Sequence, residues 1–325
     1  MKGENKKTFK KNFNILICSG GKRVDLIKEF RRALNGRGRV VITDANDLNA
    51  GRFFADDFFK APRLNDKNYL SFIKKIIKEN QIKILFSVID PELLFLVKYK
   101  KELEGLGAKV LISSLSSVET TNDKRKTAKF FQKIKILTPK IFKFNEVKKY
   151  PVFIKPYDGN GSKFAYCANN FQELDTFSRI VPNPIITEFI PGQEYTIDCL
   201  SDFSGEIINV VPRKRLEVNN GIAVKSVVDL NPAIISDAKK ILKALKVEGP
   251  ATIQLIKSPA GKRYFTEVNL RFGGGVMLGI KSGGNFPGKI INMLGGKQLK
   301  FSNNSVKDSY SMVAYLDHQF YYEKN

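Results

Sequence analysis

The sequence contains a single histidine, His318, in 325 residues. This scarcity excludes a histidine-rich metal site and argues against a Ser-His-Asp triad, because both need histidine at defined positions. The three cysteines, Cys18, Cys167 and Cys199, have no C-x-x-C or other metal-ligand spacing, so we expect reduced, buried thiols. Any chemistry must therefore rest on carboxylates, amides, lysine, arginine and backbone N–H groups.

Long apolar runs are also absent. No stretch approaches the roughly 18–20 apolar residues that span a bilayer, and residues 1–13, MKGENKKTFKKNF, lack the apolar core of a signal peptide. Hydrophobic residues make up 42% of the chain, which is ordinary for a globular protein. We therefore expect no membrane partner and a cytoplasmic location.

Acidic residues are few relative to basic ones. The 32 Asp and Glu residues stand against 55 Lys and Arg residues, which gives a formal net charge of +23. A basic excess can indicate a polyanionic partner, but here the lysines are spread along the chain and no nucleic-acid-binding motif accompanies them. We expect no nucleic-acid partner. Two interpretations stay open, a solvated basic surface and attraction of small anionic substrates such as nucleotides.

The apolar pattern changes along the chain. Residues 13–115 alternate continuous apolar runs with amphipathic stretches, which predicts a parallel sheet with covering helices. We expect strands in 13–21, 39–46, 82–90 and 108–114, and helices in 22–34, 67–80 and 91–107. Residues 116–139 are expected to be helical. From residue 140 onward short strands with a few helices predict an α+β part with antiparallel sheets.

The stretch YFTEVNLRF, residues 264–272, carries polar side chains at alternate positions. As a strand it places Glu267, Asn269 and Arg271 on one face. A carboxylate and an amide oxygen two residues apart suit Mg²⁺ together with phosphate oxygens, and Arg271 could clamp a phosphate. Gln254, in an apolar strand, could oppose Glu267 or Asn269 if the two strands pair. The alternatives are a polar sheet face in water and a glutamine bonded to the backbone.

Glycines and arginines form two further candidate sites. The glycines at 273–275 favour either close approach of the backbone to a ligand or positive φ angles, with a flexible loop as the alternative. Arg213 and Arg215 share one face of a strand, with Lys214 on the other. Two arginines on one face suit bidentate recognition of phosphate or carboxylate, and the alternative is a solvated charge run.

The stretch FIKPYDGNGSKFAY, residues 153–166, does not match the P-loop pattern. Lys155 precedes Pro156 and is therefore expected in extended backbone at the end of a strand. Residues 158–161 would form a hairpin turn whose free N–H groups close over a phosphate, so we predict a mobile lid. In ITEFIPGQEYTID, residues 186–198, Glu188 ends one strand and Glu194 opens the next, with a plain hairpin as the alternative.

These elements follow one another in an order that resembles the ATP-grasp superfamily. The order is NDKRKT, FIKP with a Gly-rich turn, TEFIPGQEY, PRKR, an isolated Gln254, and EVNLRFGGG, and the similarity extends over about residues 13–322. It is greatest to the ATP-grasp unit of the carbamoyl phosphate synthetase large subunit. The resemblance implies an ATP-grasp fold with a disordered basic tail (1–12), a pre-ATP-grasp α/β domain (13–115), a small lobe that acts as the lid (116–190) and a C-terminal lobe with a metal site (191–325).

The resemblance also implies a role for each matching residue. The expected nucleotide contacts are Lys124 and Lys155 for the phosphates, Gly159, Gly161 and Ser162 in the closing loop, Glu188, Phe189 and Ile190 for adenine, and Glu194 for ribose. The expected ligands of Mg²⁺, or of Mn²⁺, are Gln254, Glu267 and Asn269. The expected catalytic residues are Arg271, at the transferring phosphoryl group, and Arg213, Arg215 and Lys225, where the substrate carboxylate meets the γ-phosphate.

The chemistry of the family would make this chain an ATP-dependent ligase. ATP phosphorylates a small carboxylic acid to an acyl phosphate, an amine or thiol attacks it, and ADP and phosphate are released. The expected partners are thus a small carboxylate and an amine, and a homodimer is a further possibility. Lys22, Arg23, Asp90 and Glu92 are expected substrate contacts at strand ends.

Two other functions remain open from the sequence. One is an ATP-binding regulatory protein of the same fold without ligase turnover. The other is an NAD-linked enzyme that uses residues 18–24, CSGGKRV, although this loop lacks the second and third glycines of G-x-G-x-x-G.

Overall fold

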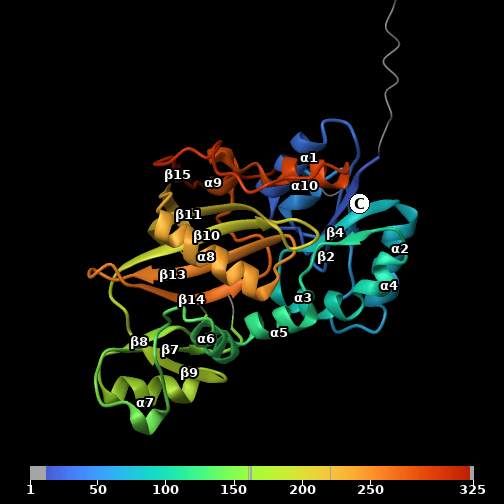
Figure 1. Cartoon of the computed structure of the whole chain (residues 1–325). Helices are drawn as coiled ribbons and strands as arrows, with labels where there is room; N and C mark the ends of the chain where they lie inside the picture. The colour runs from blue at the N-terminus through green and yellow to red at the C-terminus, as the bar shows by residue number, and fades with distance from the viewer. Residues whose placement is uncertain (1–11, 160, 162, 220, 323–325) are drawn as a thin grey trace, which may run out of the picture. The chain divides into compact units, whose positions relative to one another are not determined.

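The computed structural model describes residues 12–159, 161, 163–219 and 221–322 (Figure 1). The chain forms two compact units. The first contains the described residues up to Ser87 together with Tyr99–Val110 and Pro287–Gln298, and the second contains Val88–Lys98, Leu111–Phe286 and the described residues from Leu299 onward. Except for Asn12, the tail that we predicted to be disordered lies outside the described residues, and so does Ser162.

The first unit is built on a five-stranded parallel sheet in the order β3-β2-β1-β4-β5. The strands are β1 (Asn14–Cys18), β2 (Val40–Asp44), β3 (Asp57–Lys60), β4 (Ile82–Ser87) and β5 (Lys109–Val110). Its helical elements are α1 (Val24–Leu34), η1 (Ala50–Phe53), α2 (Tyr69–Glu79), α4 (Lys100–Glu104) and most of α10 (Phe286–Leu294). All five residues of β1 are buried, as in a strand covered on both faces. The predicted parallel α/β layer is confirmed, although β3, which is short and half-buried, was missed.

Three predicted elements differ from the structure. The single helix expected over 91–107 is two helices, α3 (Asp90–Lys98) and α4, and the strand expected over 108–114 is only β5. The helix expected over 116–139 is α5 (Leu115–Asn122) followed by α6 (Lys124–Lys133). Asp123 separates them because its backbone is extended, with φ −119° and ψ 113°, and its carboxylate accepts a hydrogen bond from the Arg125 backbone N–H at 2.8 Å. Asp123 therefore caps the N-terminus of α6 and marks the end of α5.

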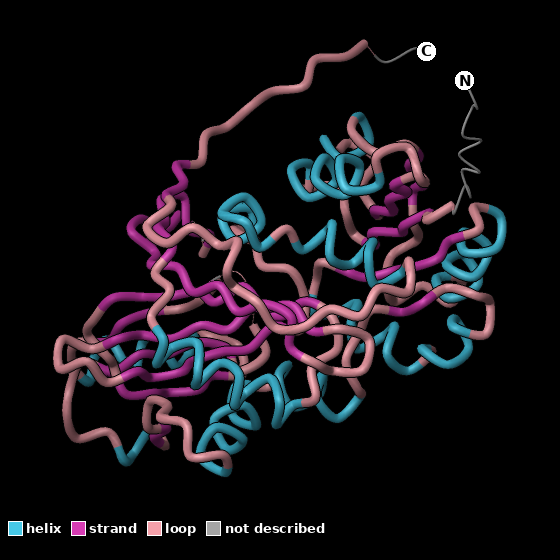
Figure 2. The backbone as a smooth tube through the Cα atoms, turned by 45° about the horizontal axis from the view of Figure 1, so that its top comes forward, coloured by secondary structure: helices cyan, strands magenta, loops and turns pink. Residues whose placement is uncertain are grey.

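The second unit contains a six-stranded antiparallel sheet in the order β14-β13-β10-β11-β12-β15. Figure 2 draws the strands of the chain in magenta. The strands are β10 (Gln193–Ser201), β11 (Ile207–Asn219), β12 (Ile222–Val228), β13 (Pro250–Lys257), β14 (Arg263–Asn269) and β15 (Ser311–Val313). Helix α8 (Pro232–Leu245) packs against β11. Two short helical turns, α9 (Met277–Gly279) and η3 (Ile280–Gly284), follow β14. The predicted antiparallel architecture is confirmed.

The register of this sheet places the polar side chains together. A row of directly opposed residues crosses four strands: Glu267 on β14, Gln254 on β13, Thr196 on β10 and Arg213 on β11. We call these four residues the polar row. Residues of the intervening positions, such as Val268, Ile253 and Ile197, are fully buried. The sheet therefore has one apolar face and one face that carries the polar row.

A second, four-stranded antiparallel sheet has the order β6-β9-β7-β8. Its strands are β6 (Ile141–Phe142), β7 (Val152–Pro156), β8 (Tyr166–Ala168) and β9 (Pro184–Glu188), with the turn η2 (Phe144–Glu146) and helix α7 (Phe171–Ile180) beside them. Val152 and Ile154 of β7 form a small core with Leu174 of α7. Alternation puts Lys155 on the other face of β7. None of the helices within the described residues has the length and apolar character needed to cross a membrane.

Candidate functional site

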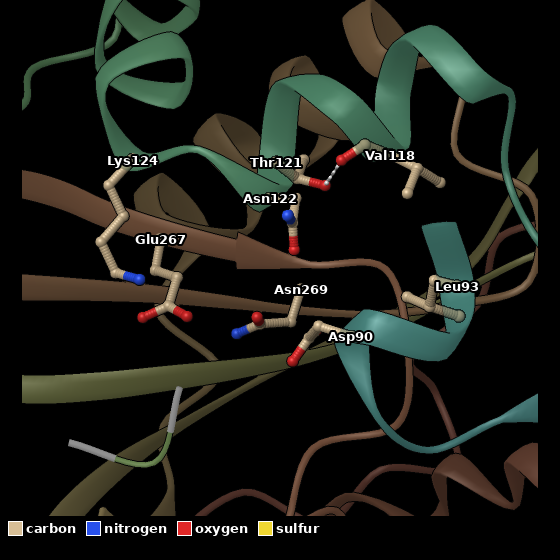
Figure 3. A pocket seen from close by; sticks show the side chains of 8 residues that line it. All are labelled: Asp90, Leu93, Val118, Thr121, Asn122, Lys124, Glu267 and Asn269. Atoms are coloured by element: carbon tan, nitrogen blue, oxygen red, sulfur yellow. Dashed lines mark hydrogen bonds between the residues drawn. The ribbon is translucent and has the colours of Figure 1, made fainter. Parts of the chain in front are cut away.

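A pocket in the second unit brings residues of β14 together with three helices (Figure 3). It is lined by Asp90, Leu93, Val118, Thr121, Asn122, Lys124, Glu267 and Asn269. The side chains of Glu267 and Asn269 project from β14 into the space below α5 and the start of α6 (Figure 3). Asn269 is only 6% exposed, yet neither side chain forms a hydrogen bond or an ion pair with another residue in the described part of the chain. Buried and half-buried polar groups of this kind are costly unless a ligand satisfies them.

Gln254 lies opposite Glu267 across the β13–β14 pair, which is one of the two partners that the sequence allowed. Arg271 differs from the prediction, because β14 ends at Asn269 and Arg271 follows in the turn beyond it. A register irregularity directly after the Gln254–Glu267 pair is a further feature that simple alternation did not reveal.

The donor set formed by Glu267, Asn269 and Gln254 fits magnesium. It contains one carboxylate and two amide oxygens, which are hard ligands. Nowhere in residues 12–159, 161, 163–219 and 221–322 do three or more His, Cys, Asp or Glu side chains group in a way that could hold a metal. Mg²⁺ is usually held by one or two carboxylates together with substrate phosphates, so this set suits a metal that shares its coordination with a nucleotide.

Two lysines place positive charge near these oxygens. Lys155 is half-buried, and burial lowers the pKa of its ammonium, an effect that Glu267 opposes and Lys124 reinforces. Lys124 is the first residue of α6 and donates from Nζ to the Gly159 carbonyl at 2.6 Å, while its backbone N–H donates to the Tyr157 carbonyl at 2.9 Å. A desolvated lysine next to a carboxylate, as Lys155 is next to Glu267, is suited to bind phosphate oxygens.

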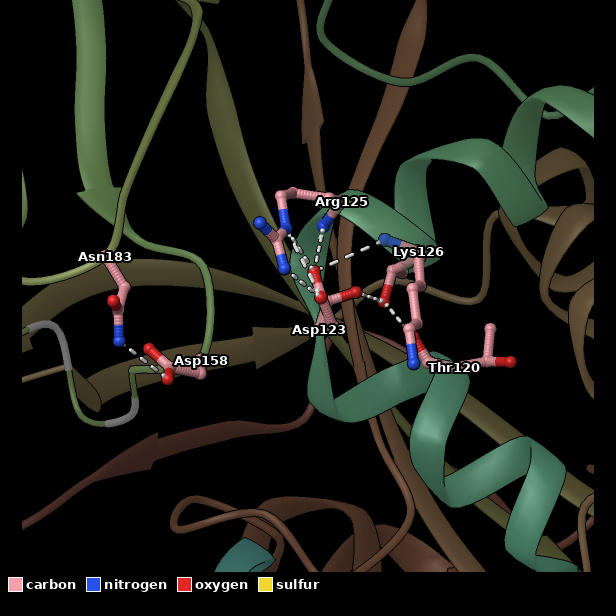
Figure 4. A network of polar contacts seen from close by, with 7 residues as sticks. Thr120, Asp123, Arg125, Lys126, Asp158 and Asn183 are labelled. Carbon is pink, nitrogen blue, oxygen red and sulfur yellow. Dashed lines mark hydrogen bonds and ion pairs between the residues drawn. The ribbon is translucent and has the colours of Figure 1, made fainter.

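Polar contacts surround both the start of α6 and the beginning of the β7–β8 turn (Figure 4). The Arg125 guanidinium lies 3.5 Å from the centre of the Tyr157 ring and donates to Asp123 at 2.7 Å. Asp158, which opens the turn, accepts from the Asn183 amide at 3.2 Å. Gly161 has φ +68°, a conformation that favours glycine. The hairpin is confirmed by the antiparallel pairing of β7 and β8, while positions 160 and 162 lie outside the described residues. Closure over a phosphate stays a prediction.

The residues expected at adenine and ribose lie at the end of β9 and the start of β10. The Glu188 backbone N–H donates to the Lys140 carbonyl at 2.8 Å, and its carboxylate accepts from the Lys140 backbone N–H at 3.3 Å. Phe189 is 36% exposed and Ile190 is buried. Glu194 is half-exposed and accepts from Nη1 of Arg215 at 2.8 Å. The structure thus joins the expected ribose ligand to an expected substrate ligand.

Arg213 is buried instead of facing an open substrate space. It is 2% exposed and donates from Nε to Oδ2 of Asp198 at 2.8 Å. A Cβ atom on Gly275 would lie 3.0 Å from Nη2 of Arg213, so the glycine loop covers the guanidinium closely. The closed environment suits a residue that orients its neighbours.

Arg215, by contrast, retains capacity for a ligand. Its side chain is 9% exposed, and Nη2 donates to the Gly221 carbonyl at 2.8 Å. Its Nε is buried and has no hydrogen-bond partner among the described residues. Burial lowers the pKa of Arg215, and Glu194 opposes that shift. A buried N–H without an acceptor is costly, so this nitrogen has an unused capacity for one hydrogen bond.

Lys225 is not brought to these arginines. It forms an ion pair with Glu217 at 2.6 Å, and both side chains are about half exposed. The residue opposite Arg215 on β12 is Ser226, which is buried and accepts from Arg213 at 3.5 Å. Sequence reasoning missed Ser226 as a site residue, because the sequence alone does not show which residue of β12 pairs with Arg215.

The glycines at 273–275 matter because they have no side chain, since none of them has a positive φ. A Cβ atom on Gly273 would lie 2.8 Å from Oγ1 of Thr252, and Gly275 lies against Arg213. The sequence allowed either close approach or positive φ, and the structure shows close approach to side chains. The following helix α9 has only three residues and offers no anion site of its own.

The four expected substrate contacts separate into two groups. Lys22 and Arg23 belong to the first unit, directly before α1. Asp90 and Glu92 begin α3 in the second unit, where both are buried. Asp90 forms an ion pair with Arg271 at 2.6 Å. The structure therefore connects two residues that the sequence assigned to different tasks.

This chain is similar to known protein families and to curated proteins. Residues 15–111 match the family described as PylC-like, N-terminal domain, and residues 181–318 match the family described as ATP-grasp in the biosynthetic pathway with Ter operon. A D-alanine--D-alanine ligase of Fusobacterium nucleatum is 29% identical over 184 residues, which cover 53% of this chain and 64%, slightly less than two thirds, of that relative. A carbamoyl-phosphate synthase of Methanobrevibacter smithii is 25% identical over 290 residues, covering 82% of this chain and 77% of the relative.

Among solved structures, the biotin carboxylase domain of Hydrogenobacter thermophilus 2-oxoglutarate carboxylase is similar to this chain. That domain was crystallised with ADP, magnesium and bicarbonate. The TM-score is 0.73 at 16% identity, and the alignment covers 92% of this chain and 73% of the other. At this level of identity the likeness shows the fold.

Proposed function

We propose that this protein, which has the ATP-grasp fold that its sequence predicts, is an ADP-forming ligase that activates a small carboxylic acid with ATP and joins it to an amine. The observation that carries the proposal is the convergence of Glu267, Asn269 and Gln254, which have no side-chain partners in the described chain, beside the desolvated Lys155. Such a cluster suits a metal–triphosphate.

Binding of ATP is assigned to residues that frame this cluster. Lys124 and Lys155 bind phosphate oxygens, and the β7–β8 turn closes over them. Glu188 and the backbone of Phe189 and Ile190 hold the adenine. Glu194 accepts hydrogen bonds from the ribose hydroxyls.

The metal set belongs to the same arrangement. Glu267, Asn269 and Gln254 hold Mg²⁺ through oxygen atoms. When bound, the metal neutralises phosphate charge during transfer. The residues around it fix the triphosphate so that the γ-phosphorus faces the acid, because phosphoryl transfer depends mainly on positioning and on charge neutralisation.

The substrate carboxylate is assigned to Arg215, whose buried Nε offers a free hydrogen bond. The ion pair between Arg213 and Asp198, which lies against Gly275, stabilises this part of the sheet. A carboxylate oxygen attacks the γ-phosphorus, the bond from phosphorus to the ADP oxygen breaks, and an acyl phosphate forms. The amine then attacks the carbonyl carbon, loses a proton and expels inorganic phosphate, which is a much better leaving group than oxide. Arg271 binds the phosphoryl oxygens during the transfer.

The proposal is tested by ADP release from ATP and Mg²⁺ across a panel of small acids paired with amines. We expect at least one pair to stimulate ADP formation in the wild-type protein. Glu267→Ala should abolish it, because one metal ligand is lost. Glu217→Ala, which removes an exposed carboxylate of the same unit, is the matched control and should retain activity.

Two results would contradict this function. Undiminished turnover of Glu267→Ala would remove the metal site from the account. Nucleotide binding without ADP release across the whole panel would instead favour a regulatory ATP-binding protein.

A further inference from the structure

Asp90 and Arg271 form a bidentate ion pair at the pocket that Glu267 and Asn269 line. Nε of Arg271 lies 2.9 Å from both carboxylate oxygens of Asp90, and Nη2 lies 2.6 Å from Oδ2. The side chain of Arg271 is 16% exposed and that of Asp90 is 11% exposed. Charge-assisted, two-pronged contacts of this kind fix the plane of a guanidinium.

Arg271 depends on such a contact for its orientation. Strand β14 ends at Asn269, so no strand ladder holds the backbone at Arg271. Thr252 donates to the Arg271 carbonyl at 3.0 Å, which fixes the backbone but leaves the long side chain free to adopt many rotamers. The side chain is therefore placed by what its guanidinium contacts.

The occupied edge of the guanidinium leaves the other edge for a ligand. Asp90 accepts from Nε and Nη2, and the Phe272 carbonyl accepts from Nη1 at 3.2 Å. A guanidinium has five N–H groups, so one on each terminal nitrogen has no acceptor among the described residues. Two such groups match two oxygens of a phosphate.

We propose that Asp90 is a positioning residue that orients Arg271 toward the γ-phosphate of the nucleotide, an inference that rests on the proposed function. Asp90 acts through Arg271. It accepts from the Nε edge of the guanidinium, so the ion pair can persist while phosphate binds the other edge. Its place at the start of α3 fixes the carboxylate by the backbone of a helix. This arrangement would let the site distinguish a triphosphate from a diphosphate.

The test compares the affinities of the protein for ADP and for the non-hydrolysable β,γ-imido-ATP, each with Mg²⁺, by calorimetry. Asp90→Asn keeps the shape of the side chain and suits a helix start. We expect it to reduce the preference for the triphosphate about tenfold while ADP affinity is retained, as for the loss of one charge-assisted hydrogen bond. The same substitution in an Arg271→Gln background should have no further effect, because coupled residues are not additive.

Asp237→Asn is the matched control. Asp237 forms an ion pair with Arg263, at the start of β14, at 2.6 Å. The substitution therefore removes another Asp–Arg pair of the same unit. Its nucleotide preference should equal that of the wild type. If Asp90→Asn does not fold, Asp90→Glu provides the second variant, because its longer side chain displaces the guanidinium and should also reduce the preference.

Several outcomes would overturn the inference. An equal loss of affinity for both nucleotides would show a merely structural role, and an unchanged preference would show no role. A greater preference in Asp90→Asn would show that Asp90 competes with phosphate for Arg271. Failure of the wild-type protein to bind either nucleotide would instead overturn the proposed function, and the inference with it.

Discussion

Arg213 and Asp198 form an ion pair in the interior of the large sheet, at 2.8 Å, with side chains that are 3% and 0% exposed. Arg213 was expected to contact substrate, yet its guanidinium lies beneath Gly275. Two charges in such a place are stable only together, since either alone would be buried without compensation. The pair therefore supports the floor of the site, and Arg215 remains as the arginine that can bind a ligand.

Breaking this pair should destabilise the protein strongly. We expect Asp198→Asn to lower the free energy of unfolding by about 3–5 kcal/mol, because it leaves Arg213 buried without a counter-charge. Glu217→Gln, which breaks the exposed pair with Lys225, should cost about 1 kcal/mol or less. Denaturant unfolding measures both values. Equal costs for the two variants would contradict the buried character of the Arg213–Asp198 pair.

Lys124 should couple nucleotide binding to the β7–β8 turn. Replacing Lys124 with Ala removes its hydrogen bond to the Gly159 carbonyl and one phosphate contact, so we expect ATP affinity to fall about tenfold or more. Lys126→Ala, on the exposed face of the same helix, is the control and should leave ATP affinity unchanged. Calorimetric titration with ATP and Mg²⁺ measures the ATP affinity of both variants. Similar losses in both variants would indicate a general effect of positive charge.

The affinity for ATP should fall as the pH rises toward the alkaline range. Burial lowers the pKa of Lys155 from its ordinary value of 10.5, so this ammonium loses its proton earlier than an exposed lysine. Only the protonated form attracts phosphate. Lys155→Arg keeps its charge to higher pH and should move the decline in ATP affinity upward. An identical pH profile for Lys155→Arg and the wild type would contradict this role.

The lowered pKa of Lys155 has an opposite effect on the stability of the nucleotide-free protein, which should rise with pH. Between the lowered pKa of Lys155 and 10.5 the unfolded chain binds more protons than the folded chain. The contribution of this group to stability therefore rises with pH across that window. Denaturant unfolding of the wild type and of Lys155→Met, compared at several alkaline pH values, measures it, and a difference that does not change with pH would contradict it.

The sequence predicted the parts of the site that depend on local periodicity. The two-residue repeat of β14 placed Glu267 and Asn269 on one face, and the apolar surroundings of Gln254 indicated the strand that pairs with it. The parallel and antiparallel layers followed from continuous and alternating apolar patterns in the same way. These features are set by neighbours within a few residues.

Other features depend on contacts between distant segments, and periodicity does not encode them. Asp90 meets Arg271 across 181 positions, and Gly275 covers Arg213 from a loop more than sixty residues away. Strand β14 ends at Asn269, which places Arg271 in the turn beyond it, and Ser226 instead of Lys225 pairs with Arg215. Asp123, an extended helix cap, divided a helix that composition alone would continue.

In the proposed ligase reaction a carboxylate of the substrate takes the γ-phosphate of ATP. It is tested most directly by supplying the wild-type protein with ATP, Mg²⁺, an active amine and its acid labelled with ¹⁸O in the carboxyl group, and by measuring the released phosphate by mass spectrometry. One ¹⁸O atom is expected in each phosphate, because the bridging oxygen of the acyl phosphate leaves with phosphorus when the amine attacks. Unlabelled phosphate, with both ¹⁸O atoms retained in the acid, would show that ATP is hydrolysed by water and would contradict the ligase mechanism.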